Sequence, residues 1–405
     1  MKVLQINMVH NGSTGNIMFN ISKLLQEKGE EVKTFSAMRW SKTQNNHELS
    51  VKNHEVFGNE YEGFLHTLFG QLTGLNGCFS YFGTKKLIRK CKKFNPDVIH
   101  LHNLHAFCIN LPLLFRYIKK NNIPVVWTLH DCWTFTGHCP YFVMANCDKW
   151  KTECHHCPQL SIYPKSRVDN TKMAHKLKKK WFSGVQDMTL VTPSKWLGDL
   201  AKESFLKDYP VKVIHNGIDL SVFKPTESDF RAKYGLIDKK VLLGVASDWG
   251  ERKGLDVFEE LARRLDDNYR IVLVGVDDEM AKTLPEKIIP INRTANQKQL
   301  AEIYTTADLF VNPTREDTYP TVNMESLACG TPVLTFRTGG SPEIPDESCG
   351  SVVEVNDVDA MEKEIVRICE ENPYSKEDCL ERAKGFDMYD RFEEYIELYK
   401  EVTNK

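Results

Sequence analysis

The chain has 405 residues, more than one hydrophobic core usually holds, so we expect two domains. Hydrophobic residues make up 41% and charged residues 27%, the composition of an ordinary soluble globular protein. The net charge of −2 lacks the basic balance typical of nucleic-acid-binding proteins, and no aromatic-basic motif appears, so we expect no nucleic-acid partner.

The opening sequence MKVLQINMVHNGSTG lacks the cationic start and long apolar stretch of a signal peptide, and no segment reaches the roughly 20 apolar residues of a membrane span. We therefore expect a cytoplasmic protein whose twelve cysteines are reduced or metal-bound. Basic residues outnumber acidic ones by 29 to 17 through residue 220, whereas acidic residues outnumber basic ones by 38 to 24 afterwards. Either the first half contacts an anionic partner, or the two halves attract each other.

Short apolar runs alternate with longer amphipathic runs, the pattern of parallel strands covered by helices. The predicted strands of the first half are KVLQINM, PDVIHLH, PVVWTLH, MTLVTP and VKVIHN, with helices over 17–28 and 85–93. Those of the second half are KVLLGVA, YRIVLVGV, LFVNPT and TPVLTF, with helices over 253–266, 296–306 and around Glu325. An aromatic-rich helix over 387–402 follows. The pattern predicts an α/β protein with two Rossmann-like domains joined near 216–225.

Ligands of such domains bind beyond the carboxyl ends of the strands, which predicts a site in a cleft between the two domains. In the first half, Gly12 and Gly15 of NGSTGN follow the first strand and would let the backbone approach an anion at a helix start, although a tight turn also explains them. His130 follows the third strand. It could donate to a substrate hydroxyl or phosphate and change charge near neutrality, or be structural. Three further histidines compete for the same role: His100, His102 and His105.

In the second half, Arg252 and Lys253 lie where a loop enters a helix, and two cations with backbone amides there would hold a diphosphate. A solvated charge pair is the alternative. Glu325 hangs from an otherwise apolar helix that Pro320 opens and Gly330 ends. A carboxylate accepts two hydrogen bonds at once, so Glu325 fits a pair of vicinal hydroxyls, and Asp317 could hold a second set.

The motifs VIHNGIDLSVF at 213–223, RKG at 252–254 and DTYPTVNMESLACGTPV at 317–333 resemble the retaining GT-B glycosyltransferases of family 4 over essentially the whole chain. GSTGN, HDCWTFTGHC and RTGGSPE resemble members that assemble bacterial exopolysaccharides, such as colanic-acid-type transferases. The resemblance implies domains over 1–216 and 217–385, with parallel sheets facing a cleft and a helix over 386–405 crossing back to the first domain. It also implies retaining transfer of a sugar from a UDP- or GDP-sugar to a saccharide or polyprenyl-diphosphate-linked acceptor, without a catalytic metal.

The same resemblance implies a role for each site residue. Glu325 would bind the ribose hydroxyls, and Lys253 with Arg252 would hold the diphosphate, which Gly12 and Gly15 let the first loop approach. His130 would lie beside the transferred sugar and the acceptor. Either Asp317 or Glu316 would contact the donor sugar. Tyr319, Pro320 and Thr321 complete the donor loop. An arginine common before the lysine is missing, because Ser247 and Asp248 stand there.

Four cysteines fall in the loop-like insertion over about 132–160: Cys139, Cys147, Cys154 and Cys157. Their number and the C-x-x-C pair fit a structural zinc site, while free thiols or disulfides are the alternatives. The basic stretches 85–95 and 174–184 indicate either peripheral contact with the cytoplasmic face of the inner membrane or solvated helix faces. Two other functions remain open: a nucleotide-sugar 2-epimerase, and a non-catalytic sugar-nucleotide-binding protein.

Overall fold

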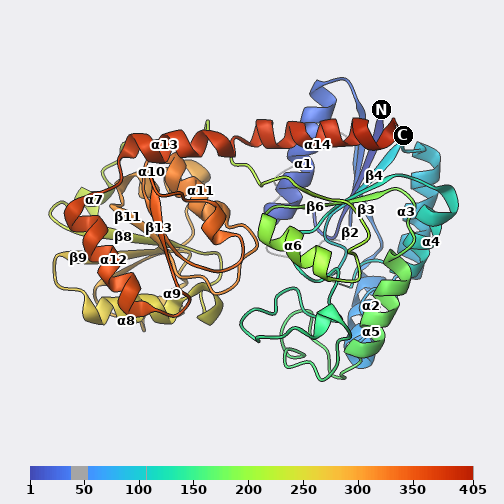
Figure 1. Ribbon diagram of the computed structural model, residues 1–405, viewed down its shortest axis with the longest axis horizontal. Helices are drawn as coiled ribbons and strands as arrows, with labels where there is room; N and C mark the ends of the chain where they lie inside the picture. The colour runs from blue at the N-terminus through green and yellow to red at the C-terminus, as the bar shows by residue number, and fades with distance from the viewer. Residues whose placement is uncertain (38–52, 106, 405) are drawn as a thin grey trace. The chain divides into compact units, whose positions relative to one another are not determined.

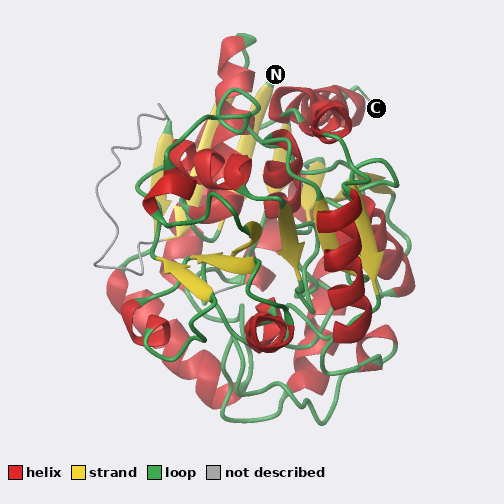
Figure 2. Cartoon of the chain, turned by 90° about the vertical axis from the view of Figure 1, so that its left-hand side faces the viewer, coloured by secondary structure: helices red, strands yellow, loops and turns green. Residues whose placement is uncertain are grey.

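The computed structural model describes residues 1–37, 53–105 and 107–404. The chain divides into two units, unit 1 with Met1–Ile214 and Phe392–Lys405, and unit 2 with His215–Arg391. Each unit has one parallel sheet between helices, as Figures 1 and 2 show. The last helix begins in unit 2 and continues into unit 1, so the chain passes between the units twice.

The sheet of unit 1 has seven strands in the order β3-β2-β1-β4-β5-β6-β7, all paired in parallel. The strands are β1 Lys2–Asn7, β2 Glu31–Ala37, β3 His54–Phe57, β4 Val98–Leu101, β5 Val125–Thr128, β6 Met188–Thr192 and β7 Val211–Val213. Every residue of β4, β5 and β6 is buried. Helices cover both faces of such a sheet, which explains the continuous apolar runs in the sequence.

The helices of unit 1 are α1 Gly12–Glu27, α2 Glu60–Thr73, α3 Tyr81–Phe94, α4 Leu111–Asn121, α5 Thr171–Phe182, α6 Lys195–Glu203 and most of α14 Met388–Thr403. Its core joins side chains of the central strands to Trp133, Phe135 and Trp150 of the loop between β5 and α5. That long loop is therefore packed on the domain.

Unit 2 has a parallel sheet of six strands in the order β10-β9-β8-β11-β12-β13. The strands are β8 Lys240–Val245, β9 Tyr269–Val274, β10 Ile288–Ile291, β11 Leu309–Asn312, β12 Val333–Phe336 and β13 Gly350–Val353. The helices are α7 Phe230–Lys233, α8 Leu255–Arg264, α9 Asp278–Ala281, α10 Gln297–Thr306, α11 Thr321–Ala328, α12 Val358–Glu371 and α13 Lys376–Ala383. Two apolar clusters, one on each face, form its core.

Most predicted elements are present, with shifted ends. The helix expected over 17–28 begins earlier, at Gly12. The helix expected over 253–266 covers only Leu255–Arg264, because Glu251–Lys253 form a 3₁₀ turn that ends at the left-handed Gly254. In the part of the chain that the structure describes, each helix is too short or too polar to cross a lipid bilayer.

Helix α14 is held on unit 1 by two buried tyrosines. The Tyr399 hydroxyl lies 2.6 Å from His100 Nδ1 on β4, and Thr128 Oγ1 on β5 donates to the Tyr395 hydroxyl over 3.2 Å. His100 Nε2 lies 2.8 Å from Thr128 Oγ1. Because the Thr128 hydroxyl donates to Tyr395, it accepts from His100 Nε2–H, and Nδ1 accepts from Tyr399. His100 therefore fastens the last helix, which gives it a structural role.

Candidate functional site

Three loops of unit 2 meet at the carboxyl edge of its sheet, following β8, β11 and β12. The Arg315 amide donates to the Arg252 carbonyl over 2.9 Å, and the Gly340 amide donates to the Asp317 carbonyl over 3.3 Å. The Thr338 hydroxyl donates to the Arg315 carbonyl over 2.8 Å. The loops singled out from the sequence therefore form one continuous surface, where ligands of parallel α/β sheets bind.

Two glycines permit this close approach of the loops. Gly254 and Gly339 have φ angles of +75° and +53°, a region that residues with a Cβ rarely adopt. A Cβ at Gly254 would lie 2.4 Å from the Pro313 carbonyl oxygen, and one at Gly339 would lie 1.7 Å from that of Asp317. Glycine is therefore required at both positions.

Lys253 and Asp317 form an ion pair, with 2.7 Å between Nζ and Oδ2. Arg252 lies beside this pair, where its Nη1 donates to the Glu316 carbonyl over 3.2 Å. The Lys253 and Asp317 side chains are 17% and 19% exposed, whereas Glu316 is only 4% exposed. Of the two candidates for the first acid, Asp317 is thus the one that reaches the surface beside the cations.

Glu325 of α11 accepts a hydrogen bond from the Tyr304 hydroxyl of α10 over 3.1 Å. Burial raises the pKa of Glu325 to about 7, although hydrogen bonds from Tyr304 and Thr321 act in the opposite direction. Two hydroxyls of the protein therefore contact this acid. Tyr304 belongs to no motif, and only its spacing of three residues from the core residue Ala301 could have drawn attention to it.

Pro320 and Gly330 mark the ends of α11, and Tyr319 precedes it. Pro320 is the N-cap residue and Thr321 the first helical residue, while Gly330 follows the helix end with φ of +82°. Tyr319 is only 3% exposed, and its ring stacks on His215 with 4.8 Å between centroids. Its side chain therefore packs inside unit 2.

In unit 1, the loop between β1 and α1 carries the two glycines of the first motif. Gly12 has φ of +69° with open space around it, as a backbone that approaches a ligand requires. A Cβ at Gly15 would lie 2.5 Å from the His10 carbonyl carbon, so Gly15 also serves the packing of α1 against its own entry loop. The Asn7 amide group donates to the Thr14 hydroxyl over 3.1 Å and fixes the turn.

His130 belongs to a buried chain of hydrogen bonds. Gln5 Nε2 donates to Ser22 Oγ over 2.7 Å, and Gln5 Oε1 lies 3.0 Å from His102 Nε2. His102 Nδ1 lies 3.1 Å from His130 Nε2. Because Gln5 Oε1 can only accept, His102 carries its proton on Nε2, and neutral His102 then accepts at Nδ1 from His130 Nε2–H. This pattern assigns the lone pair of neutral His130 to Nδ1. No sequence motif indicated that Gln5 and His102 belong to this hydrogen-bond chain.

The pKa of His130 lies below the neutral range in this structure. Burial lowers the pKa of His130 to about 4; Asp131 acts in the opposite direction, and His105 lowers it further. His105 Nε2 lies 2.9 Å from Asp131 Oδ2, and its Nδ1 lies 2.8 Å from the Tyr163 hydroxyl. At neutral pH, His130 is thus an uncharged imidazole whose Nδ1 can accept a hydrogen bond.

The four loop cysteines are free thiols without a disulfide. The Cys139 thiol interacts with Cys157 and lowers the pKa of Cys157 to about 7, while the Gly137 amide donates to Cys154 Sγ over 3.2 Å. Among the described residues, no three His, Cys, Asp or Glu side chains are grouped closely enough to hold a metal ion.

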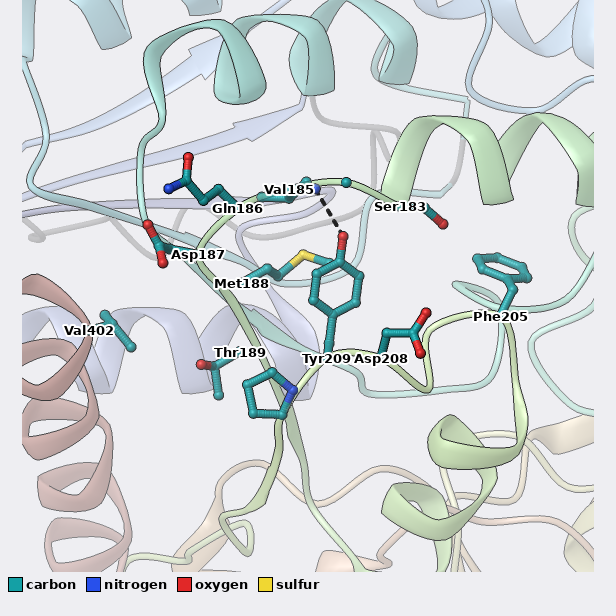
Figure 3. Close-up of a pocket in the computed structure, with 12 residues that line it drawn as sticks. Ser183, Val185, Gln186, Asp187, Met188, Thr189, Phe205, Asp208, Tyr209 and Val402 are labelled. Atoms are coloured by element: carbon teal, nitrogen blue, oxygen red, sulfur yellow. Dashed lines mark hydrogen bonds between the residues drawn. The ribbon is translucent and has the colours of Figure 1, made fainter. Parts of the chain in front are cut away.

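A separate pocket of about 440 Å³ lies in unit 1 beside the segments that enter β6 and β7. Figure 3 shows Asp187, Asp208 and Tyr209 around it, with the Val185 amide donating to the Tyr209 hydroxyl over 3.0 Å. These residues precede their strands, so the pocket lies at the amino edge of the sheet. Since α/β proteins bind ligands at the carboxyl edge, it is not the candidate site.

Two sequence families match most of the chain. Residues 14–222 match the family described as Glycosyltransferase Family 4, and residues 239–371 match the one described as Glycosyl transferases group 1. WcaC of Escherichia coli (strain K12), named for a glycosyl transferase role in colanic acid biosynthesis, is 26% identical over 273 residues, 65% of each chain. The D-inositol 3-phosphate glycosyltransferase of Mycolicibacterium smegmatis is 25% identical over 177 residues, 40% of this chain and 41% of that protein. The chain thus spans less than two thirds of the length of either relative.

Solved structures with a similar fold include Anabaena Alr3699/HepE in complex with UDP-glucose, with a TM-score of 0.68 and 15% identity. The comparison covers 99% of this chain and 100% of that one. Sucrose-phosphate synthase from Thermosynechococcus elongatus gives a TM-score of 0.69 at 16% identity, covering 99% of this chain and 98% of that chain. At such identities the likeness establishes a shared fold.

Proposed function

Because the chain belongs to glycosyltransferase family 4 and has the GT-B fold, we propose that it transfers a sugar from a nucleoside-diphosphate donor to a saccharide acceptor in cell-surface polysaccharide assembly. The observation that carries the proposal is the surface of unit 2 where Arg252, Lys253, Asp317 and Glu325 come from loops and helices beyond the carboxyl edge of one sheet. The likeness to WcaC supports exopolysaccharide as the product class.

The donor is assigned to unit 2. Glu325 accepts hydrogen bonds from the ribose hydroxyls, and Lys253 and Arg252 contact the diphosphate, where negative charge develops as the sugar leaves. Asp317 turns from Lys253 to the hydroxyls of the donor sugar. The amides at the start of α11, after Tyr319 and Pro320, face the same phosphates. The structural likeness to HepE in complex with UDP-glucose makes UDP-glucose the first donor to test.

The acceptor is assigned to unit 1, with His130 beside the transferred sugar. In the proposed retaining reaction, the acceptor oxygen attacks on the face that the diphosphate vacates, and the departing phosphate oxygen takes the acceptor proton. No side chain then acts as a nucleophile and no metal is needed, because preorganised cations and amides stabilise the leaving group. Neutral His130 orients the acceptor hydroxyl through Nδ1. The acceptor is a saccharide, free or linked to polyprenyl diphosphate.

The test is a panel of nucleotide sugars, with release of the free nucleoside diphosphate as the readout. Transfer or slow hydrolysis releases it, whereas a 2-epimerase that only interconverts donors, or a binding protein, does not. Glu325→Ala should weaken donor binding by roughly tenfold or more, the size of a lost hydrogen bond to a charged group. Glu347→Ala, an exposed acid of unit 2, is the matched control. Unchanged donor affinity in Glu325→Ala would contradict the ribose assignment.

We also propose that Cys139, Cys147, Cys154 and Cys157 bind a structural zinc ion. The Cys139–Cys157 interaction and the amide directed at Cys154 support a thiolate site. Lys178 lies beside these thiols, and its Nζ donates to the Trp133 carbonyl over 2.6 Å. Burial lowers the pKa of Lys178 to about 7, while Cys154 and Cys139 favour its charged form. Binding requires the loop to draw the sulfur atoms together. Elemental analysis of protein never exposed to chelator should find one zinc per chain, and none would reject the site.

A further inference from the structure

A cluster of apolar side chains on α2 and at the start of α3 points into solvent. Tyr61 is 84% exposed, Phe64 66% and Phe82 75%. Among the described residues, seventeen large apolar side chains are exposed, and seven of them lie within residues 61–82. The seven are Tyr61, Phe64, Leu65, Phe69, Leu72, Tyr81 and Phe82, which we call the α2 surface. So dense an apolar patch is rare unless it meets a partner.

The α2 surface is fixed on the domain by the opposite side of α2. His66 Nδ1 lies 2.7 Å from Ser80 Oγ, and a Cβ at Gly70 would lie 2.6 Å from the Phe107 ring, so α2 packs closely through this narrow strip. The Glu62 carboxylate accepts from the Phe82 and Gly83 amides over 2.7 and 2.8 Å. These contacts fix Phe82 beside α2, so the aromatic side chains are presented outward by a rigid scaffold.

The loop before α5 extends this surface. The Arg167 amide donates to the Gln71 carbonyl over 2.8 Å, and the Asn170 side chain donates to the Thr73 carbonyl over 3.0 Å. Figure 1 shows this part of unit 1, with α2 and α5 near each other. The loop exposes Ile162 and Val168, at 56% and 48%. The apolar patch therefore continues from α2 across residues 162–168.

Basic residues lie in the same segments as the patch, and Lys85 Nζ lies 4.4 Å from the centroid of the Tyr81 ring. Lys85, Lys86 and Arg89 are exposed along α3, and Lys165 and Arg167 are exposed in the adjoining loop. The acidic residues nearby are Glu60, Glu62 and Asp169. Glu62 is engaged by the α3 amides, and Asp169 accepts from the Thr171 amide and hydroxyl. Positive charges beside exposed aromatic residues are complementary to an anionic lipid headgroup layer, and they would repel a second copy of the same surface.

We propose that the α2 surface and residues 162–168 dock unit 1 on an anionic phospholipid bilayer. The anchoring elements differ from those expected from sequence. Of the stretch 174–184, Phe182 is fully buried, Lys178 is 1% exposed and Trp181 is half-buried against the core, so that helix has little apolar surface to insert. The stretch 85–95 contributes charge, while the apolar insertion comes from α2, which carried no basic signal.

The docking surface adjoins the proposed acceptor site. Tyr163, in the loop that exposes Ile162, places its hydroxyl 2.8 Å from His105 Nδ1, and His105 pairs with Asp131, the neighbour of His130. An acceptor sugar carried on a membrane lipid could thus extend from the docking surface towards His130. This last step rests on the proposed function, whereas the docking surface itself does not.

The test is co-sedimentation of the full chain with vesicles of phosphatidylethanolamine and phosphatidylglycerol, compared with vesicles of phosphatidylcholine alone. We expect the wild type to bind the anionic vesicles in a salt-sensitive manner. The double variant Phe64→Ser with Phe82→Ser should lose about tenfold or more in vesicle affinity, and Lys85→Glu with Lys86→Glu should lose about as much. Matched controls in unit 2 are Ile237→Ser, 68% exposed, and the exposed Lys363→Glu, and both should bind like the wild type.

Each outcome decides the proposal. No binding by the wild type, or unchanged binding by the Phe64 and Phe82 variant, would overturn it. Light scattering without vesicles tests whether the α2 surface is instead a dimer interface. A dimer that the aromatic substitutions dissociate would also overturn the proposal. Release of nucleoside diphosphate from a soluble donor is measured in parallel and should be unchanged in these variants. If neither the wild type nor the variants turn over donor, but vesicle binding still depends on the α2 surface, the proposed function is wrong and the docking proposal is supported.

Discussion

Lys253 and Asp317 lie 64 residues apart in the chain, and their side chains meet with 2.7 Å between Nζ and Oδ2. The sequence singles out the lysine for a diphosphate and the acid for hydroxyl groups, and the structure brings the two together. In this structure, Asp317 therefore pairs with the cation that the proposed donor needs. Donor binding has to exchange one anionic partner of Lys253 for another.

Replacement of Asp317 should expose this competition. We expect Asp317→Asn to bind UDP roughly two- to fivefold more tightly, because Lys253 no longer has to leave a partly buried ion pair. The same variant should lose transfer activity, since the donor sugar loses a carboxylate acceptor. Titration calorimetry with UDP measures the first effect. Asp238→Asn, an exposed acid before β8, controls for the loss of one negative charge. Weaker UDP binding by Asp317→Asn would contradict the competition.

The raised pKa of Glu325 predicts a pH-dependent effect on stability. Its pKa is about 7 in the folded chain against an ordinary value of 4.5, so the folded protein holds a proton that the unfolded chain has released between these values. The contribution of this group is fully present below pH 4.5 and is lost as the pH rises through about 7. Glu325→Gln should therefore unfold with a free energy higher than the wild type by up to roughly 3 kcal/mol at pH 8.

Urea unfolding at pH 8 and near pH 5 measures this difference. The gain should be largest at pH 8 and shrink towards pH 5, where the wild-type carboxyl is itself protonated. The exposed Glu347→Gln variant controls for the loss of a surface charge. An equal gain at both pH values would show that the glutamine acts through packing.

His102 should act as a positioning residue for His130. His102→Asn keeps a carbonyl oxygen that can accept from His130 Nε2–H, whereas His102→Leu removes the acceptor. We expect the leucine variant to lose roughly 10- to 100-fold in kcat/KM for the acceptor, and the asparagine variant to lose less. Nitrogen NMR of the imidazole should show the proton leaving Nε2 of His130 in the leucine variant only. Equal losses of kcat/KM in the two variants, with an unchanged His130 tautomer, would show that His102 acts only through packing.

The bond between Tyr399 and His100 should stabilise unit 1. Tyr399→Phe leaves the buried Nδ1 of His100 without its donor, which should lower the free energy of unfolding by about 1–3 kcal/mol. Six of the seven tryptophans precede residue 215, so tryptophan fluorescence in urea reports mainly on unit 1. Tyr389→Phe removes an exposed hydroxyl from the same helix and should change stability by less than about 0.5 kcal/mol. Equal stability of the two variants would contradict the fastening role.

Much of the fold could be predicted because parallel strands buried on both faces leave continuous apolar runs, as in β1, β5 and β9. Four strands were missed, β2, β3, β10 and β13, and polar residues, proline or glycine interrupt their apolar runs. β3, with the sequence HEVF, lies at the sheet edge and is only partly buried, and β13 begins at Gly350. The helix expected from Lys253 begins two residues later because the left-handed Gly254 interrupts it, a conformation that periodicity does not report.

At the candidate site, the sequence indicated which loops follow the carboxyl ends of the strands, because strand ends and glycines can be read from residue order. It could not indicate which side chains meet. Burial leaves Asp317, and not Glu316, at the surface beside the cations, and the chain from Gln5 through His102 assigns the tautomer of His130. Likewise, the basic helix over 174–184 has the composition of a membrane anchor, but its apolar side is already covered by the core. Such facts depend on contacts between distant segments.

The course of α14 has a consequence for biosynthesis. Unit 2 is a continuous stretch of chain, His215–Arg391, inserted between two parts of unit 1. A ribosome therefore completes all of unit 2 before the tyrosines that seal His100 and Thr128 have been made. Until α14 is synthesised, the surface of unit 1 around His100 and Thr128 stays uncovered, although unit 2 is already able to fold. A chaperone that shields this surface would act during that interval.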